Sequence, residues 1–206
     1  MGKGYKIGMS MPIAAKYTYN PVTKKVSYSD PTYLGEAMTG TFTPNYADAS
    51  LYGDDKEVDS SKEMTNVTIA LGVTKLPIPA HNVLYGSAVK GSKVSEKTTD
   101  TANDVGLGFI SRQSNGKYTA IVYPKAKFAR GAETYNTKGQ SVTYSTPTLN
   151  GTAVGSDEDN EIRSFEEDLS KEEALAYVTK ILGDPNATQG TQTPGVTQDP
   201  EESEVE

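Results

Sequence analysis

The chain has 206 residues, of which 35% are hydrophobic and 23% charged, so it carries enough apolar material for a folded domain. It has no cysteine, which excludes disulfide scaffolds, thiolate zinc sites and thiol chemistry, and its single histidine, His81, excludes multi-histidine metal sites. The net charge is −7, but the acids gather in residues 54–63, 157–173 and 183–206, and the rest of the chain is net basic. The N-terminal residues hold no apolar run, and no stretch approaches the roughly 18 apolar residues of a membrane span. A protein made in a cytoplasm, with no membrane span, is expected.

Strands are predicted for most of the chain after a short N-terminal arm, residues 1–12, because apolar residues recur with a period of two. The rows are, in chain order, Val26 and Tyr28; Leu34, Met38 and Phe42; Val67, Ile69, Leu71 and Val73; Val105, Leu107 and Phe109; Tyr118, Ala120, Val122, Ala126 and Phe128; Val142 and Tyr144. The face opposite the fifth row is expected to be polar, with Lys117, Thr119, Lys125 and Lys127. Turns are predicted at Asn20-Pro21 and Asp30-Pro31, and a tight hairpin at Asn115-Gly116.

Two helices are expected. The first covers residues 79–84 and ends at Gly86. The second covers residues 170–182, where Ser170 and Glu173 form a capping box and Gly183 ends the helix. Residues 44–64 are predicted to be a long loop, and loops of that length are usually functional or disordered. Residues 184–206 are expected to be a disordered acidic tail, which leaves residues 13–183 as the domain.

Candidate catalytic or binding groups are few. The acids Asp54, Asp55, Glu57 and Asp59 could ligate a hard cation, but their spacing is not that of a known calcium loop, which favours a solvated acidic loop. No sequence motif ties His81 to a nucleophile or carboxylate. The basic run 112–130, interleaved with aromatic residues, could bind nucleic acid, yet an outward polar face is the favoured interpretation. No enzymatic activity, cofactor or metal is expected.

Several short segments resemble, in order, the major tail proteins of long, non-contractile-tailed phages that infect Gram-positive bacteria. They are residues 15–17 (AKY), 25–29 (KVSYS), 34–37 (LGEA), 48–55 (DASLYGDD), 105–109 (VGLGF), 125–129 (KAKFA), 137–140 (TKGQ), 146–148 (TPT) and 151–153 (GTA). Thirteen tyrosines and no tryptophan also suit a protein with much contact surface.

The resemblance implies a mainly β protein with flanking helices, a β-sandwich or half-barrel of the tail tube type that closes into a ring on oligomerisation. It implies hexameric rings stacked into a tube, located in the virion tail and assembled in the host cytoplasm. The partners would be further copies of the chain and the tape-measure, tail-tip and tail-terminator proteins, with DNA passing through without specific binding. The subunit and ring contacts would come from the 44–64 segment, through Tyr46, Asp48, Leu51, Tyr52, Asp54 and Asp55. A non-catalytic β-sandwich that recognises a host-surface glycan or a partner protein is the alternative.

Overall fold

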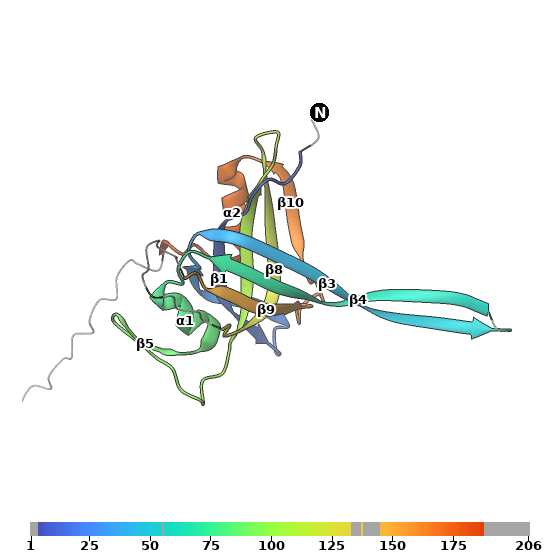
Figure 1. Ribbon diagram of the computed structural model, residues 1–206, viewed down its shortest axis with the longest axis horizontal. Helices are drawn as coiled ribbons and strands as arrows, with labels where there is room; N and C mark the ends of the chain where they lie inside the picture. Colours follow the sequence, from blue (N-terminus) through green and yellow to red (C-terminus); the bar gives the residue numbers. More distant parts are fainter. Residues whose placement is uncertain (1–3, 55, 133–136, 138–144, 188–206) are drawn as a thin grey trace, which may run out of the picture.

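The computed structural model describes residues 4–54, 56–132, 137 and 145–187, and for residues 51–53 and 56–59 it describes the backbone alone. This part of the chain is mainly β with two helices, as the sequence predicts (Figure 1). The strands are β1 (Ser10–Asn20), β2 (Lys25–Tyr33), β3 (Ala37–Gly53), β4 (Lys56–Val73), β5 (Ala88–Lys90), β6 (Lys93–Ser95), β7 (Asp104–Arg112), β8 (Tyr118–Ala129), β9 (Thr148–Val154) and β10 (Ser164–Leu169). The helices are α1 (Ile78–Tyr85) and α2 (Lys171–Leu182).

One antiparallel sheet, in the order β2-β1-β7-β8-β9-β4-β3, organises the fold. It divides at β8, where the first half of that strand pairs with β10 and the second half with β9. The β3 end then returns over the middle of the sheet, because Phe42 stacks on Phe109 and Tyr123 with ring centroids 5.0 and 5.1 Å apart. The small hairpin β5–β6, which the sequence analysis did not predict, follows α1.

The inner core lies between the β9-β4-β3 leaf and the β1-β7-β8 strands, and α1 packs against it. The predicted row on β4 is confirmed, since all four of its residues belong to this core, as is the row on β7. In the predicted row of Leu34, Met38 and Phe42, Leu34 is buried and Phe42 packs against the core, but Met38 is 56% exposed. The pairing shifts between Ala37 and Thr39, and this irregularity breaks the alternation on which the Met38 prediction depended.

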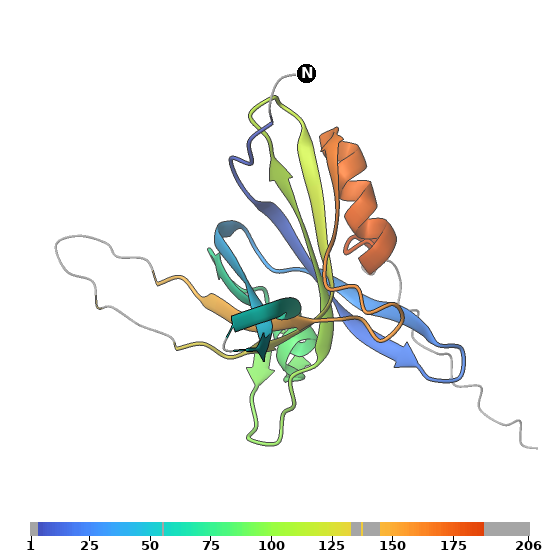
Figure 2. The same cartoon turned by 90° about the vertical axis from the view of Figure 1, so that its right-hand side faces the viewer.

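The opposite face of the central strands is covered by α2, as Figure 2 shows. The predicted capping box is present: Ser170 accepts a hydrogen bond from the Glu173 backbone, and Glu173 accepts one from the Ser170 backbone. That second bond holds the pKa of the Glu173 carboxyl below its ordinary value. The helix packs closely on β7, where a Cβ at Gly108 would lie 2.5 Å from the Val178 side chain. The alternating glycines of β7 therefore make room for α2.

Strand β8 does not present one apolar face, so the predicted fifth row is wrong. Tyr118, Ala120 and Val122 face α2, whereas Ala126 and Phe128 belong to the inner core. An extra residue near Pro124 shifts the register, since Val105 pairs with Ala126 but Leu107 with Tyr123. Such a bulge moves every later side chain to the other face. Thr119, expected on an outward face, is buried and accepts a hydrogen bond from Gln113.

The predicted turns have mixed outcomes. Asn20-Pro21 begins the β1–β2 turn, so that turn is confirmed. A hairpin at Asn115-Gly116 is also confirmed, but Gly116 has a positive φ of +83° and Asn115 does not, so this is not a two-residue turn with positive φ at both positions. Asp30-Pro31 is not a turn: it lies inside β2, where Asp30 has φ +52° and the pairing with β1 slips. The proline removes a backbone donor, and the strand absorbs it as a bulge.

The predicted start of the domain differs from the structure, and most of its predicted C-terminal tail lies outside the described residues. The N-terminal arm is shorter than predicted, because β1 already begins at Ser10. The predicted strand with Val142 and Tyr144, and all but the first four residues of the 184–206 tail, lie outside the described residues.

Candidate functional site

The predicted loop 44–64 is wrong, because these residues form the far half of a long antiparallel hairpin. Strands β3 and β4 stay paired from Ala37 opposite Val73 to Gly53 opposite Lys56. Residues 45–64, here named the hairpin arm, project beyond the body of the protein (Figure 1). Nine residues from Asn45 to Gly53, at ~3.3 Å each, give the arm a reach of about 30 Å.

The sequence does not reveal this ribbon, because neither face is buried among the side chains that the structure describes. Every arm side chain that the structure describes is exposed, so no core imposes an apolar period on residues 45–64. Without that period, a search for alternation finds no strand. Among the described residues, the backbone ladder and a few polar side-chain contacts hold the two strands together. The only sequence signals were the length and the amino-acid composition of the segment, and both are compatible with a ribbon or with a loop.

A polar clamp fixes the root of the arm. The Asn45 side-chain amide donates to Asn66 Oδ1 at 2.7 Å and to Thr68 Oγ1 at 2.9 Å. The Thr65 hydroxyl donates to the Asn45 carbonyl at 3.1 Å, where the pairing register shifts between Asn45 and Tyr46. A bulge at this point increases the local twist and re-aims the strands that follow it. The direction of the arm is therefore set at its root.

The predicted contact residues that the structure describes all belong to this one ribbon. Tyr46 is 57% exposed and lies opposite Met64, which is 41% exposed. Asp48 forms an ion pair across the ribbon with Lys62 at 3.6 Å. Asp54 has φ +48° at the tip, as a tight hairpin turn requires. Leu51 and Tyr52 lie in β3 opposite Asp59 and Glu57, and Asp55 lies outside the described residues.

Apolar side chains line a recess of about 430 Å³ at the root of the arm. Its lining includes Tyr46 and Met64 of the arm, Phe42, Tyr123 and Ile162, together with the polar Asn160 and Arg163. Large exposed apolar side chains beside a recess are typical of a protein interface. Tyr46 and Met64 are the large apolar side chains that the described part of the arm exposes.

The sheet ends in two outer strands, β3 and β2, that each have a strand neighbour on one side among the described residues. Outer strands present N–H and C=O groups to which another chain can pair. The β2 edge is partly occupied, because the Val26 N–H donates to the Glu158 carboxylate at 2.9 Å and Pro31 has no N–H. The long β3 edge is interrupted only by Pro44.

The basic residues of β8 are paired with acids of the same chain. Lys125 Nζ lies 2.6 Å from Asp157 Oδ2, and Lys127 Nζ lies 3.1 Å from Asp104 Oδ1. Tyr17 also donates to Asp157, at 2.9 Å. The bonds from Lys125 and Tyr17 hold the pKa of Asp157 below its ordinary value. Burial would lower the pKa of Lys125, but the bond to Asp157 outweighs it and the pKa is raised.

His81 lies in α1, with Nδ1 3.7 Å from Glu96, whose carboxylate also meets Arg130 Nε at 3.4 Å. Arg130 in turn lies over the Tyr85 ring and donates to the Ser87 hydroxyl at 2.6 Å. These contacts connect α1 to the segment after β6 and to the end of β8. Within the described ranges, no group of three or more histidine or carboxylate side chains could hold a metal ion.

No family model matches the chain, and no curated protein matches it. None of the helices in the described part of the chain is both long and apolar enough to cross a membrane. The candidate site therefore consists of the hairpin arm, its apolar root and the two sheet edges.

Proposed function

We propose that this chain is a structural virion protein that assembles into stacked, hexameric rings and so forms the tail tube of a bacteriophage, the conduit for genome ejection. The observation that carries the proposal is the hairpin arm. It extends about 30 Å from the body and exposes every described side chain. Such a ribbon contributes nothing to the core of its own subunit, which favours a role between subunits.

The open sheet supports the same proposal. Pairing the β3 edge of one copy with the β2 edge of the next would continue the sheet from subunit to subunit. Closing the ring would then remove the exposed β2 and β3 edges, which is a general way to prevent edge-strand aggregation. A head-to-tail contact between different surfaces gives a closed ring when its rotation closes.

The remaining parts of the proposal follow from the phage resemblance. The protein would be located in the virion tail, after assembly in the host cytoplasm. Its partners would be copies of itself and the tape-measure, tail-tip and tail-terminator proteins. It would have no catalytic activity, and DNA would pass through without specific binding.

Negative-stain electron microscopy of the concentrated protein tests the proposal. Rings or tubes of uniform diameter are expected, together with high-mass species in gel filtration with light scattering. A protein that stays monomeric at every concentration, and that binds a host-surface glycan or a partner protein instead, would show that the chain is a binding module.

A further inference from the structure

The chain contains two Asn-Gly pairs, and the fold places them in very different surroundings. Asn115-Gly116 lies in the turn between β7 and β8, and Asn150-Gly151 lies in β9. An asparagine before a glycine is chemically labile, because the backbone nitrogen of the glycine can attack the side-chain carbonyl carbon of the asparagine. Glycine has no side chain to hinder this approach and has the backbone freedom that it needs. The local sequence therefore gives both pairs similar reactivity, and the structure decides between them.

The pair in the β7–β8 turn is arranged to react. Asn115 and Gly116 are both exposed, and Gly116 has φ +83°. The Lys117 N–H donates to Asn115 Oδ1 at 3.0 Å, so it stabilises the negative charge that an attack would place on this oxygen. One backbone bond restrains the nucleophile, since the Gly116 N–H donates to the Gln113 carbonyl at 3.1 Å. That bond lies at the tip of a hairpin, where local opening costs little free energy.

The pair in β9 is held in the interior of the sheet. Gly151 pairs with Ile69 of β4 on one side and with Phe128 of β8 on the other. A Cβ at Gly151 would lie 2.7 Å from the Phe128 ring and 2.8 Å from the Lys127 carbonyl oxygen, so its neighbours surround this backbone closely. The flanking strands would have to separate before the Gly151 nitrogen could reach the Asn150 side chain, and such an opening costs far more than fraying of a turn.

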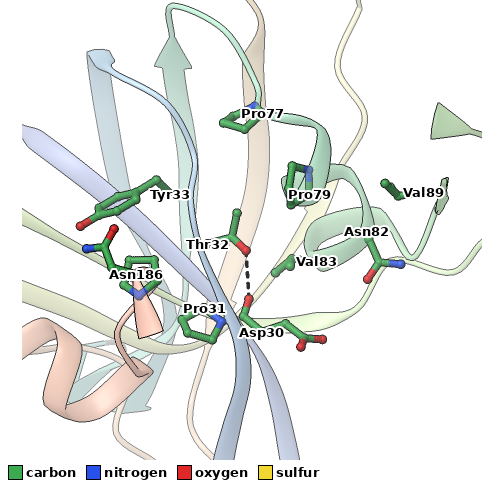
Figure 3. Close-up of a pocket in the computed structure, with 11 residues that line it drawn as sticks. Asp30, Pro31, Thr32, Tyr33, Pro77, Pro79, Asn82, Val83, Val89 and Asn186 are labelled. Carbon is green, nitrogen blue, oxygen red and sulfur yellow. Dashed lines mark hydrogen bonds between the residues drawn. The ribbon is translucent and has the colours of Figure 1, made fainter. Parts of the chain in front are cut away.

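Asn186 provides the converse comparison. It is one of the residues that line a recess of about 710 Å³ between β2 and α1, as Figure 3 shows. The residue is exposed, like Asn115, but it is followed by Ala187, whose methyl group hinders the approach of the backbone nitrogen. The three asparagines therefore separate two requirements, a following glycine and a backbone that opens easily. Asn115 alone among them meets both.

The Asn115 side chain also joins the turn to two other segments. Its Nδ2 donates to Asp168 Oδ1, near the end of β10, at 3.4 Å. A Cβ at Gly4 would lie 2.8 Å from the same nitrogen, so the N-terminal segment passes directly beside it. That segment is bonded to the turn, because the Tyr5 N–H donates to Ser114 Oγ at 3.0 Å and the Ser114 N–H donates to the Tyr5 carbonyl at 2.8 Å. The turn is therefore an attachment point of the N-terminal segment.

We propose that Asn115 is a site of spontaneous deamidation in the folded protein, and that the fold protects Asn150. The Gly116 nitrogen forms a bond to Asn115 Cγ and the Cγ–Nδ2 bond breaks. The proton from the Gly116 nitrogen leaves with the amide as ammonia, and a succinimide ring remains. A water molecule from the solvent then opens the ring at either carbonyl, which gives aspartate or isoaspartate.

Both products change what the turn holds. A carboxylate replaces the amide that donates to Asp168, and two like charges in contact repel each other. Isoaspartate also adds one atom to the main chain of the turn, which disturbs the bonds between Ser114 and Tyr5. The modification therefore loosens the N-terminal segment. This inference concerns the single subunit and does not depend on the proposed assembly.

Peptide mapping tests the site. Folded protein is incubated in a mildly alkaline buffer, beside a sample unfolded in guanidinium chloride and a fresh sample that gives the background from digestion. Trypsin places the three asparagines in separate peptides, residues 113–117, 139–163 and 181–206. Mass spectrometry with fragmentation locates the gain of about 1 Da that each deamidation produces.

At least ten-fold more product is expected at Asn115 than at Asn150 or Asn186 in the folded protein. In the unfolded chain the two Asn-Gly pairs should react to a similar extent, which shows that the fold causes the difference. Equal conversion of Asn115 and Asn150 in the folded protein, or none at Asn115, would overturn the proposal.

Limited proteolysis tests the consequence for the N-terminal segment. Trypsin cleavage after Lys6 should be at least three-fold faster in incubated protein than in fresh protein. Incubated Asn115→Ser, which has no amide to lose, is the control and should be cleaved at the rate of the fresh variant. Unchanged cleavage of the incubated wild type, or an equal acceleration in Asn115→Ser, would overturn the link between the modification and this segment.

Discussion

Removing the hairpin arm should separate assembly from folding. The change deletes residues 48–61 and joins Ala47 to Lys62 through Asn-Gly, so that a three-residue loop connects Ala47 to its cross-strand partner Glu63. All described side chains in the deleted segment are exposed, so the apolar area lost from the core is close to zero. The Asp48–Lys62 pair is a surface ion pair worth at most about 1 kcal/mol. Shortening the connection also favours folding, by roughly 0.6 kcal/mol for each halving of loop length.

These contributions nearly cancel, so the free energy of unfolding should change by no more than about 1 kcal/mol. For a domain of this size, that is a shift in Tm of at most about 4 °C. Scanning calorimetry measures the shift, and electron microscopy with light scattering measures assembly. The control is Asp48→Asn with Lys62→Gln, which breaks the ion pair and keeps the arm. Normal tubes from the deletion variant would refute the assignment of the arm to assembly, and a Tm loss beyond 10 °C would show that the arm belongs to the fold.

Four further expectations follow from the structure and sequence. Ser170→Ala removes the α2 N-cap, which costs about 1 kcal/mol, and should lower the Tm by roughly 2–4 °C in a thermal circular dichroism scan. Because the folded state lowers the pKa of Asp157, its contribution to stability is present above the unfolded pKa and is lost as the pH falls through the lower folded pKa. The wild-type Tm should therefore fall more steeply below about pH 4 than that of Asp157→Asn. Truncation after residue 187 should leave the Tm unchanged, and limited proteolysis should remove residues 188–206 first; a large Tm loss would contradict this. Assembled tubes should bind short DNA duplexes weakly even at low salt, where phosphate contacts are strongest. Tight, salt-sensitive binding that disappears when Lys117, Lys125 and Lys127 are changed to glutamate would instead indicate a basic lumen.

The sequence predicts those elements whose burial leaves a regular pattern. On β7 and on the second half of β4, one face meets the inner core, and the period of two is intact from Val67 to Val73. The N-cap of α2 is equally local, because Ser170 and Glu173 are three residues apart and bond to each other's backbone. In such cases the residues that determine the local structure are close together in the sequence.

Other features depend on contacts distant in the chain, which no local pattern records. The bulge in β8 exists because that strand must pair with β7 and also change its buried face along its length, and the sequence shows only Pro124 as a trace of it. Likewise, Lys125 looks like a surface lysine in the sequence, yet Asp157 lies 2.6 Å from it, thirty-two residues further on. This pairing reduces the basic character of the segment, which the local sequence alone does not show.

The sequence does not predict the hairpin arm because its described side chains make no buried contacts that would leave a pattern. The lack of buried contacts also limits the stability of the arm in a free subunit. A two-stranded ribbon without a buried face is marginally stable in water, because its ladder must offset the conformational entropy of both strands. Under the proposed assembly, the surface of a second copy supplies the missing packing. The ordering of the arm and the joining of successive rings would then be coupled, since each stabilises the other. Free subunits should accordingly exchange the arm amides with solvent far faster than the amides of β7, and assembled tubes should protect both. Equal protection of the arm before and after assembly would show that it is held by its own subunit and that this coupling does not exist.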